Sequence, residues 1–87
     1  GVYKRKGDYD RALSLLEEAL RLHRQALPEG HPDIATSLDK LAVLRSSRGD
    51  YDQALPLFEE ALAMRRAALP PSHPDITDSL SNLAGVY

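Results

Sequence analysis

The 87 residues are enough for one small domain, and eleven basic against thirteen acidic side chains leave a net charge of −2 with no long block of one sign. This balance gives no electrostatic basis for binding nucleic acid, and no apolar run approaches the ~20 residues of a membrane span or resembles a signal peptide. The chain has no cysteine, which excludes disulfides and cysteine-ligated metal sites and fits a reducing compartment, so we expect a cytoplasmic protein.

The sequence repeats itself with a period of 42 residues. Residues 27–34 return in large part as residues 69–76, and Gly-Asp-Tyr-Asp at 7–10 returns at 49–52. Residues 1–45 laid over residues 43–87 give 23 identities in 45 pairs, and Gly-Val-Tyr at 1–3 recurs at 85–87, two periods on. We therefore predict two repeat units that are cut within a helix at both ends, as in a segment of a longer repeat array or in a protein designed from such an array.

The first predicted elements are a short stub helix over residues 1–6 and a long helix over residues 9–27. Gly7 is expected to end the stub, because glycine adopts the left-handed conformation of helix ends cheaply, and Asp8 is expected to cap the long helix. Apolar residues recur through the long helix in steps of three and four, which is helical periodicity. They form a stripe too wide for one partner, so this helix should pack against neighbours on two sides.

A proline-bounded loop separates the long helix from a shorter helix over residues 34–48. Pro28 and Pro32 cannot lie in a helix interior, and Asp33 is the expected cap of the shorter helix. Gly49 and Asp50 should end that helix and begin the next. Its predicted core positions are Ile34, Ala35, Leu38, Leu41, Ala42 and Leu44.

The second unit repeats this pattern with a long helix over residues 51–69 and a final helix over residues 76–87. Pro56 interrupts the first of these, so we expect either a displaced helix start or a mild kink there. Asp75 should cap the final helix. Short links force successive helices to be antiparallel, so the predicted fold is all-α, with helical hairpins stacked as a right-handed solenoid.

The histidines are the residues that most invite a catalytic or metal-binding interpretation. His31 and His73 each precede an aspartate by two residues, but two equal loops without a nucleophile at fixed spacing favour a structural role in helix capping. His23 is replaced by Arg65 in the next unit, which predicts an exposed position. The adjacent glutamates of the long helices point about 100° apart and do not converge as a general acid–base pair. We therefore predict a protein that is not an enzyme and uses no metal or cofactor.

Both units resemble the tetratricopeptide repeat. The second helix of that repeat is resembled by Gly49-Asp50-Tyr51 with Ala54, Phe58 and Ala61. Its first helix is resembled by Leu38, Leu41 and Ala42. The 42-residue period, the long second helix and Leu55-Pro56-Leu57-Phe58 are similar to the repeats of kinesin light chains. Further matches are Gly7, Tyr9, Ala12, Leu16 and Ala19 in the first unit and Leu80, Leu83, Ala84 and Tyr87 in the last.

This resemblance implies a protein-interaction scaffold whose concave groove, lined by the first helix of each hairpin, binds a peptide or a helical partner. The family often carries Asn-Asn before the Leu-Ala pair, and only Asn82 keeps that pattern here. Lys4 and Arg5 would add basic charge at the edge of the groove. Carried over by position, the other groove residues are Thr36, Asp39, Lys40, Val43, Ser46, Ser47, Asp78, Ser81 and Gly85.

A structural role through self-association is the alternative. Repeat arrays need about three repeats and polar caps for independent stability, and this chain has two repeats and no cap. The final helix would expose Leu80, Leu83 and Val86, because no long helix follows to cover them. We therefore expect the isolated chain to form a homo-oligomer, end to end or by exchange of helices.

Overall fold

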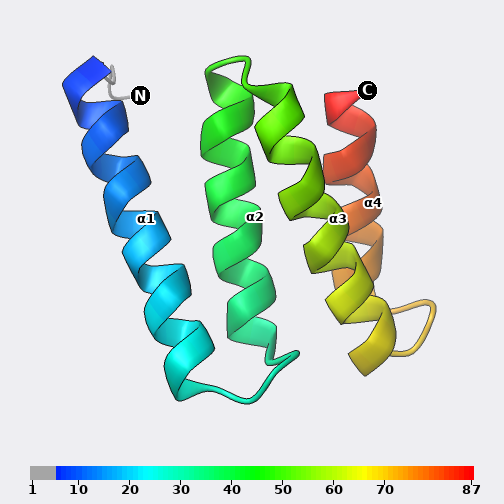
Figure 1. The fold of residues 1–87 in the computed structure, drawn as a ribbon. Helices are drawn as coiled ribbons and strands as arrows, with labels where there is room; N and C mark the ends of the chain where they lie inside the picture. The colour runs from blue at the N-terminus through cyan, green and yellow to red at the C-terminus, as the bar shows by residue number, and fades with distance from the viewer. Residues whose placement is uncertain (1–5) are drawn as a thin grey trace.

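The structure, a computed structural model, describes residues 6–87, which form four helices joined by short links (Figure 1). They are α1 (Lys6–Ala26), α2 (Pro32–Ser47), α3 (Tyr51–Ala68) and α4 (Pro74–Val86). Successive helices run antiparallel, and contacts join α1 to α2, α2 to α3 and α3 to α4. The prediction of an all-α fold of stacked helical hairpins is confirmed.

Two buried clusters hold the helices together, and both are centred on the packing of α2 against α3. In the first cluster, Ile34, Ala35 and Leu38 of α2 meet Ala61 of α3, with leucines of the first unit packed against them. In the second, Ala42 meets Ala54 and Phe58, with Leu83 and Val86 of α4 packed alongside. The fully buried alanines allow α2 and α3 to approach closely, because the side chains at the contact set the distance between helix axes.

The start of α1 differs from the prediction. The predicted stub over residues 1–6 lies outside the described residues except for Lys6, where α1 already begins. Gly7 and Asp8 lie within α1, so the prediction that they end one helix and cap the next is wrong. The repeat equivalent Gly49 does end α2, with φ 82°, whereas Gly7 has no positive φ. A helix continues through glycine at a cost of about 1 kcal/mol relative to alanine, and α1 does so.

Histidine, and not aspartate, caps α2 and α4. Nδ1 of His31 accepts a hydrogen bond from the amide of Asp33 at 3.1 Å, which corrects the predicted Asp33 cap. Pro32 occupies the first helical position, where the missing amide proton costs no hydrogen bond. Asp33 lies in the first turn, where its negative charge interacts favourably with the helix dipole. The second loop repeats this geometry with His73, Pro74 and Asp75.

The long helix α3 begins at Tyr51, as predicted, and contains Pro56 within its length. Its start is therefore not displaced towards Pro56. Asp50 precedes it as the N-cap residue, but the Asp50 side chain makes no capping hydrogen bond. Instead, the hydroxyl of Tyr9 donates to Oδ2 of Asp50 at 3.4 Å, which ties the start of the first unit to the α2–α3 link.

Candidate protein-binding surface

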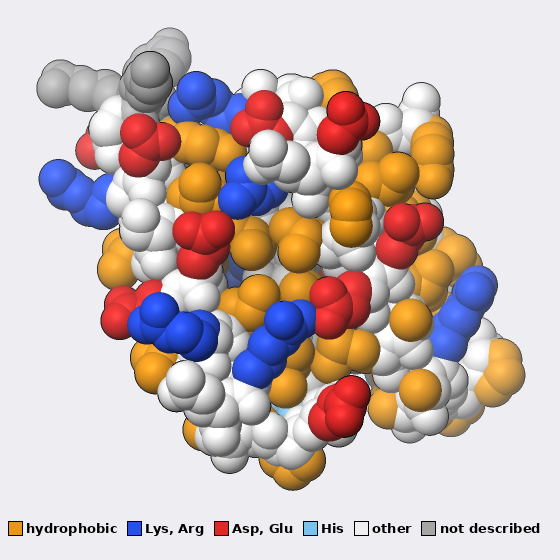
Figure 2. Space-filling model, in the orientation of Figure 1, with side chains coloured by type: hydrophobic (Ala, Val, Ile, Leu, Met, Phe, Trp, Pro, Cys, Tyr) orange, Lys and Arg blue, Asp and Glu red, His pale blue; other side chains and the backbone are white. Residues whose placement is uncertain are grey.

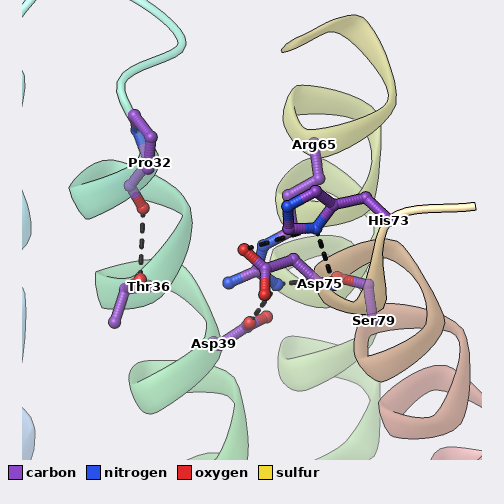
Figure 3. A network of polar contacts seen from close by, with 7 residues as sticks. All are labelled: Pro32, Thr36, Asp39, Arg65, His73, Asp75 and Ser79. Atoms are coloured by element: carbon purple, nitrogen blue, oxygen red, sulfur yellow. Dashed lines mark hydrogen bonds and ion pairs between the residues drawn. The ribbon is translucent and has the colours of Figure 1, made fainter. Parts of the chain in front are cut away.

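The predicted groove residues of α2 include one exposed stripe. Thr36, Lys40, Val43 and Ser47 are all exposed and follow one another in steps of four, three and four, so they lie along one side of the helix. We call these four residues the α2 stripe. The hydroxyl of Thr36 donates to the carbonyl of Pro32 at 3.1 Å (Figure 3), and that of Ser47 donates to the carbonyl of Leu44, so within residues 6–87 Lys40 and Val43 are the members of the stripe whose side chains make no such bond.

The equivalent positions of α4 continue this pattern one period later. Asp78, Ser81 and Gly85 are exposed, and Asn82 is half-buried. Asn82 stands 42 residues after Lys40, so each unit presents a side chain that can donate hydrogen bonds at the same position. Lys4 and Arg5 lie outside the described residues.

A polar network joins α2, α3 and α4 beside these positions (Figure 3). Arg65 of α3 pairs with the carboxylate of Asp39 in α2 and donates to Oγ of Ser79 in α4 at 2.7 Å. The side chains of Arg65 and Asp39 are only 13% and 16% exposed, and Ser79 is fully buried. One guanidinium therefore joins the two helices that carry the predicted groove, and it engages Oδ2 of Asp39, whereas Oδ1 is buried without a hydrogen-bond partner among the described residues.

The first unit has a counterpart of this network. Nδ1 of His23 in α1 lies 2.8 Å from Oγ of Ser37, which is buried in α2. His23 and Ser37 are the repeat equivalents of Arg65 and Ser79, so the prediction that His23 is exposed is wrong. The position that holds His23 in one unit and Arg65 in the next faces inward and contacts a serine. Both units carry that serine, as Ser37 and Ser79, and this identity is the sequence signal that could have indicated the contact.

Ser46 also differs from an open groove position. Its hydroxyl oxygen is buried, whereas the hydroxyl of Ser47 donates to the carbonyl of Leu44 at 2.6 Å. On the neighbouring side of α2, Arg45 pairs with Glu17 of α1 at 3.3 Å and also donates to Gln53 of α3. The C-terminal end of α2 is therefore held to both flanking helices.

A hollow of about 950 Å³ lies away from the α2 stripe, between α1 and α3, with Ile34 of α2 and Met64 of α3 among its lining residues. Arg24 of α1 and Glu60 of α3 also line this hollow and pair with each other at 2.5 Å. Figure 2 shows hydrophobic side chains on this face with charged side chains around them. Sequence analysis did not predict this hollow, because it depends on the spacing between two helices that are not neighbours in the chain.

The predicted self-association end of α4 is only partly open. Leu80 is exposed, but Leu83 and Val86 are half-buried, because they pack against the cluster of Ala42, Ala54 and Phe58. The expectation that all three are exposed is therefore correct for Leu80 and wrong for the other two.

The model of the tetratricopeptide repeat family matches residues 1–67, which is most of the chain. The chain belongs to the tetratricopeptide repeat family. Folds of this family are commonly protein–protein interaction scaffolds and are typically not enzymes. A search of curated proteins gave no match.

A solved tetratricopeptide-like structure extends this assignment. It is the crystal structure of nearly identical TPR-like repeats described as a kinesin light chain of Podosopora anserina, with a TM-score of 0.84 and 28% sequence identity. The match covers 98% of this chain and 40% of the other. The predicted similarity to kinesin light chain repeats is confirmed.

Two further findings apply to the described part of this tetratricopeptide chain. Among residues 6–87, no helix combines the length and the apolar character needed to cross a membrane. Over the same residues, no group of three or more histidine, cysteine, aspartate or glutamate side chains is arranged to hold a metal ion.

Proposed function

We propose that this segment binds a peptide or a helical segment of a partner protein along the α2 stripe and the equivalent positions of α4. The observation that carries the proposal is the exposure of Val43 between Lys40 and Ser47, on a helix whose other side forms the core. An apolar side chain beside the ammonium donor of Lys40 suits a partner that presents both an apolar residue and a main-chain carbonyl.

The Arg65 network supports this proposal through preorganisation. Because Arg65 contacts Asp39 of α2 and Ser79 of α4, the two helices that carry the proposed surface are held at a fixed spacing before any partner binds. Binding a rigid surface costs less ordering entropy than binding a mobile one. The absence of cysteine from the sequence suits a reducing compartment such as the cytoplasm. The balance of acidic and basic side chains favours a protein partner over nucleic acid or a membrane.

A peptide-display selection on this chain tests the proposal. We expect enrichment of a consensus motif that is lost when Lys40 and Asn82 are both changed to alanine. The matched control changes Arg66 and Gln25 to alanine, which removes one exposed cation and one exposed amide from α3 and α1. Absence of enrichment on a folded chain, or equal loss in the variant and the control, would contradict the proposal.

A second candidate function is assembly through α4. Leu80 is exposed, whereas its repeat equivalent Leu38 is fully buried in the cluster that includes Ala61 of the following helix α3. We propose that this face of α4 supports self-association of the chain. Sedimentation equilibrium that finds one 9.6 kDa species across the micromolar range would contradict it.

A further inference from the structure

Two histidines occupy the same capping position, one at the start of α2 and one at the start of α4. Nδ1 of His31 accepts a hydrogen bond from the amide of Asp33 at 3.1 Å, and Nδ1 of His73 accepts from the amide of Asp75 at 3.1 Å (Figure 3). A backbone amide can only donate, so in both caps Nδ1 carries a lone pair and the ring proton lies on Nε2. The fold therefore requires the neutral form of each imidazole.

A histidine cap differs from the usual caps in its response to pH. Serine, threonine and asparagine keep a side-chain oxygen that accepts a hydrogen bond at any ordinary pH, and the aspartate carboxylate does so at neutral pH. Imidazole gains its second proton between about pH 5 and 8, and the imidazolium carries an N–H on both ring nitrogens. Protonation of His31 or His73 therefore removes the acceptor that caps the helix.

The charged groups around His31 offer little in place of the lost bond. Oδ2 of Asp33 lies 3.9 Å from Nδ1 of His31, but the Asp33 side chain is 63% exposed, and exposed ion pairs contribute little. Glu29 of the preceding link is exposed, and Arg24 of α1 and Glu60 of α3, which line the neighbouring hollow, pair with each other. A cation at a helix N-terminus is also disfavoured by the helix dipole.

The surroundings of His73 are similar. Oδ2 of Asp75 lies 3.9 Å from Nδ1 of His73, and the Asp75 side chain is 53% exposed. Arg65 of α3 and Asp75 line one small cleft between α2, α3 and α4, and Asp39 of α2 is already paired with Arg65 (Figure 3). The neighbouring group from α3 is thus a cation, which cannot accept a hydrogen bond from a protonated ring.

We propose that the two histidine caps form a pH-sensitive device that holds the first turns of α2 and α4 at neutral pH and releases them when the imidazoles are protonated. The stability that the caps contribute is present above the pH range in which imidazole gains a proton, and it is lost as the pH falls through that range. Thr36 and Asp78 of the predicted partner surface stand one turn further along these helices, so a bound partner should dissociate more readily at acidic pH. This effect on a partner rests on the proposed function, whereas the effect on stability does not.

Replacing both histidines with asparagine tests the device, because asparagine is among the best capping residues and does not titrate. Loss of one cap typically lowers the folding equilibrium constant about fivefold. Between about pH 7.5 and about pH 5.5, that constant should therefore fall roughly tenfold more for the unmodified chain than for the His31→Asn, His73→Asn variant, in urea unfolding at one fixed protein concentration. The third histidine, His23, is present in both chains, so its titration cancels in the comparison. Each single variant is a matched control and should show an intermediate fall.

Nuclear magnetic resonance gives a readout that does not depend on the variants. In long-range proton–nitrogen spectra of the unmodified chain at neutral pH, both capping rings should have Nδ1 unprotonated and Nε2 protonated. The amide signals of Asp33 and Asp75 should shift with the titration of these rings.

A capping ring with its proton on Nδ1 at neutral pH, or an equal pH dependence of unfolding in the unmodified chain and the double variant, would overturn the inference. A selected peptide provides the separate test of the partner effect. A pH-dependent difference in unfolding without any change in peptide affinity would uphold the caps and contradict the proposed surface, so the two failures are distinguishable.

Discussion

Arg65 links three helices, because its guanidinium is carried by α3 and contacts both Asp39 of α2 and Ser79 of α4. Removing it leaves the mostly buried carboxylate of Asp39 without its cation and Ser79 without its donor. Breaking one side of a buried ion pair typically costs 3–5 kcal/mol, and the residual exposure of this pair places the expected loss near the lower end.

We therefore predict that Arg65→Ala lowers the free energy of unfolding by about 3 kcal/mol. The matched control is Arg66→Ala, since Arg66 is the exposed neighbour of Arg65 and its loss should change stability by less than about 0.5 kcal/mol. Urea unfolding at one fixed protein concentration measures both, because self-association would otherwise shift the midpoints. Equal effects of the two substitutions would show that the network contributes nothing to stability.

His23 shows why such contacts are difficult to predict from one sequence. Replacement of histidine by arginine in the next unit is compatible with an exposed position and equally with an inward position that contacts a polar group. Which of these two positions His23 occupies depends on Ser37, which lies fourteen residues away in sequence and contacts His23 only when α1 packs on α2. The exposed members of the α2 stripe were easier to predict, because helical periodicity alone separates them from the core positions of the same helix.

At the scale of the helices, the two Gly-Asp-Tyr-Asp segments adopt different structures. Gly49 has φ 82° and ends α2, whereas Gly7 lies inside α1. The amides of Gly49 and Asp50 donate to the carbonyls of Ser46 and Arg45 at 2.9 Å, and these hydrogen bonds close the end of α2. Sequence alone predicted the same break at both places, because the repeat made the two segments appear equivalent.

Alanine substitutions at these glycines should therefore have opposite effects. Gly49→Ala forces a side chain into the left-handed region and should destabilise the fold by roughly 1–2 kcal/mol. Gly7→Ala lies in a helix with open space around it and should stabilise by roughly 0.5 kcal/mol, because alanine loses less conformational entropy there. Thermal unfolding of the two variants measures whether each substitution raises or lowers the stability of the fold. A loss of stability at both positions would mean that Gly7 also ends a helix.

At the scale of the whole molecule, the 42-residue period predicted the order and type of the four helices within residues 6–87, but not that α1 runs through Gly7. The period could not predict the hollow between α1 and α3 or the partial burial of Leu83 and Val86. Both depend on the distances between helices in space. The result is a short solenoid in which the α2 stripe and the Leu80 side of α4 are distinct surfaces.

The claim that the α2 stripe binds a partner is tested most directly by measuring the affinity of a selected peptide for chains that carry single Glu substitutions. Fluorescence anisotropy should give a Kd for Leu80→Glu within about twofold of the unmodified chain, and a Kd for Val43→Glu raised by at least about tenfold, which corresponds to about 1.4 kcal/mol. The reverse result, with binding lost in Leu80→Glu and retained in Val43→Glu, would contradict the account and place the partner on the Leu80 side of α4.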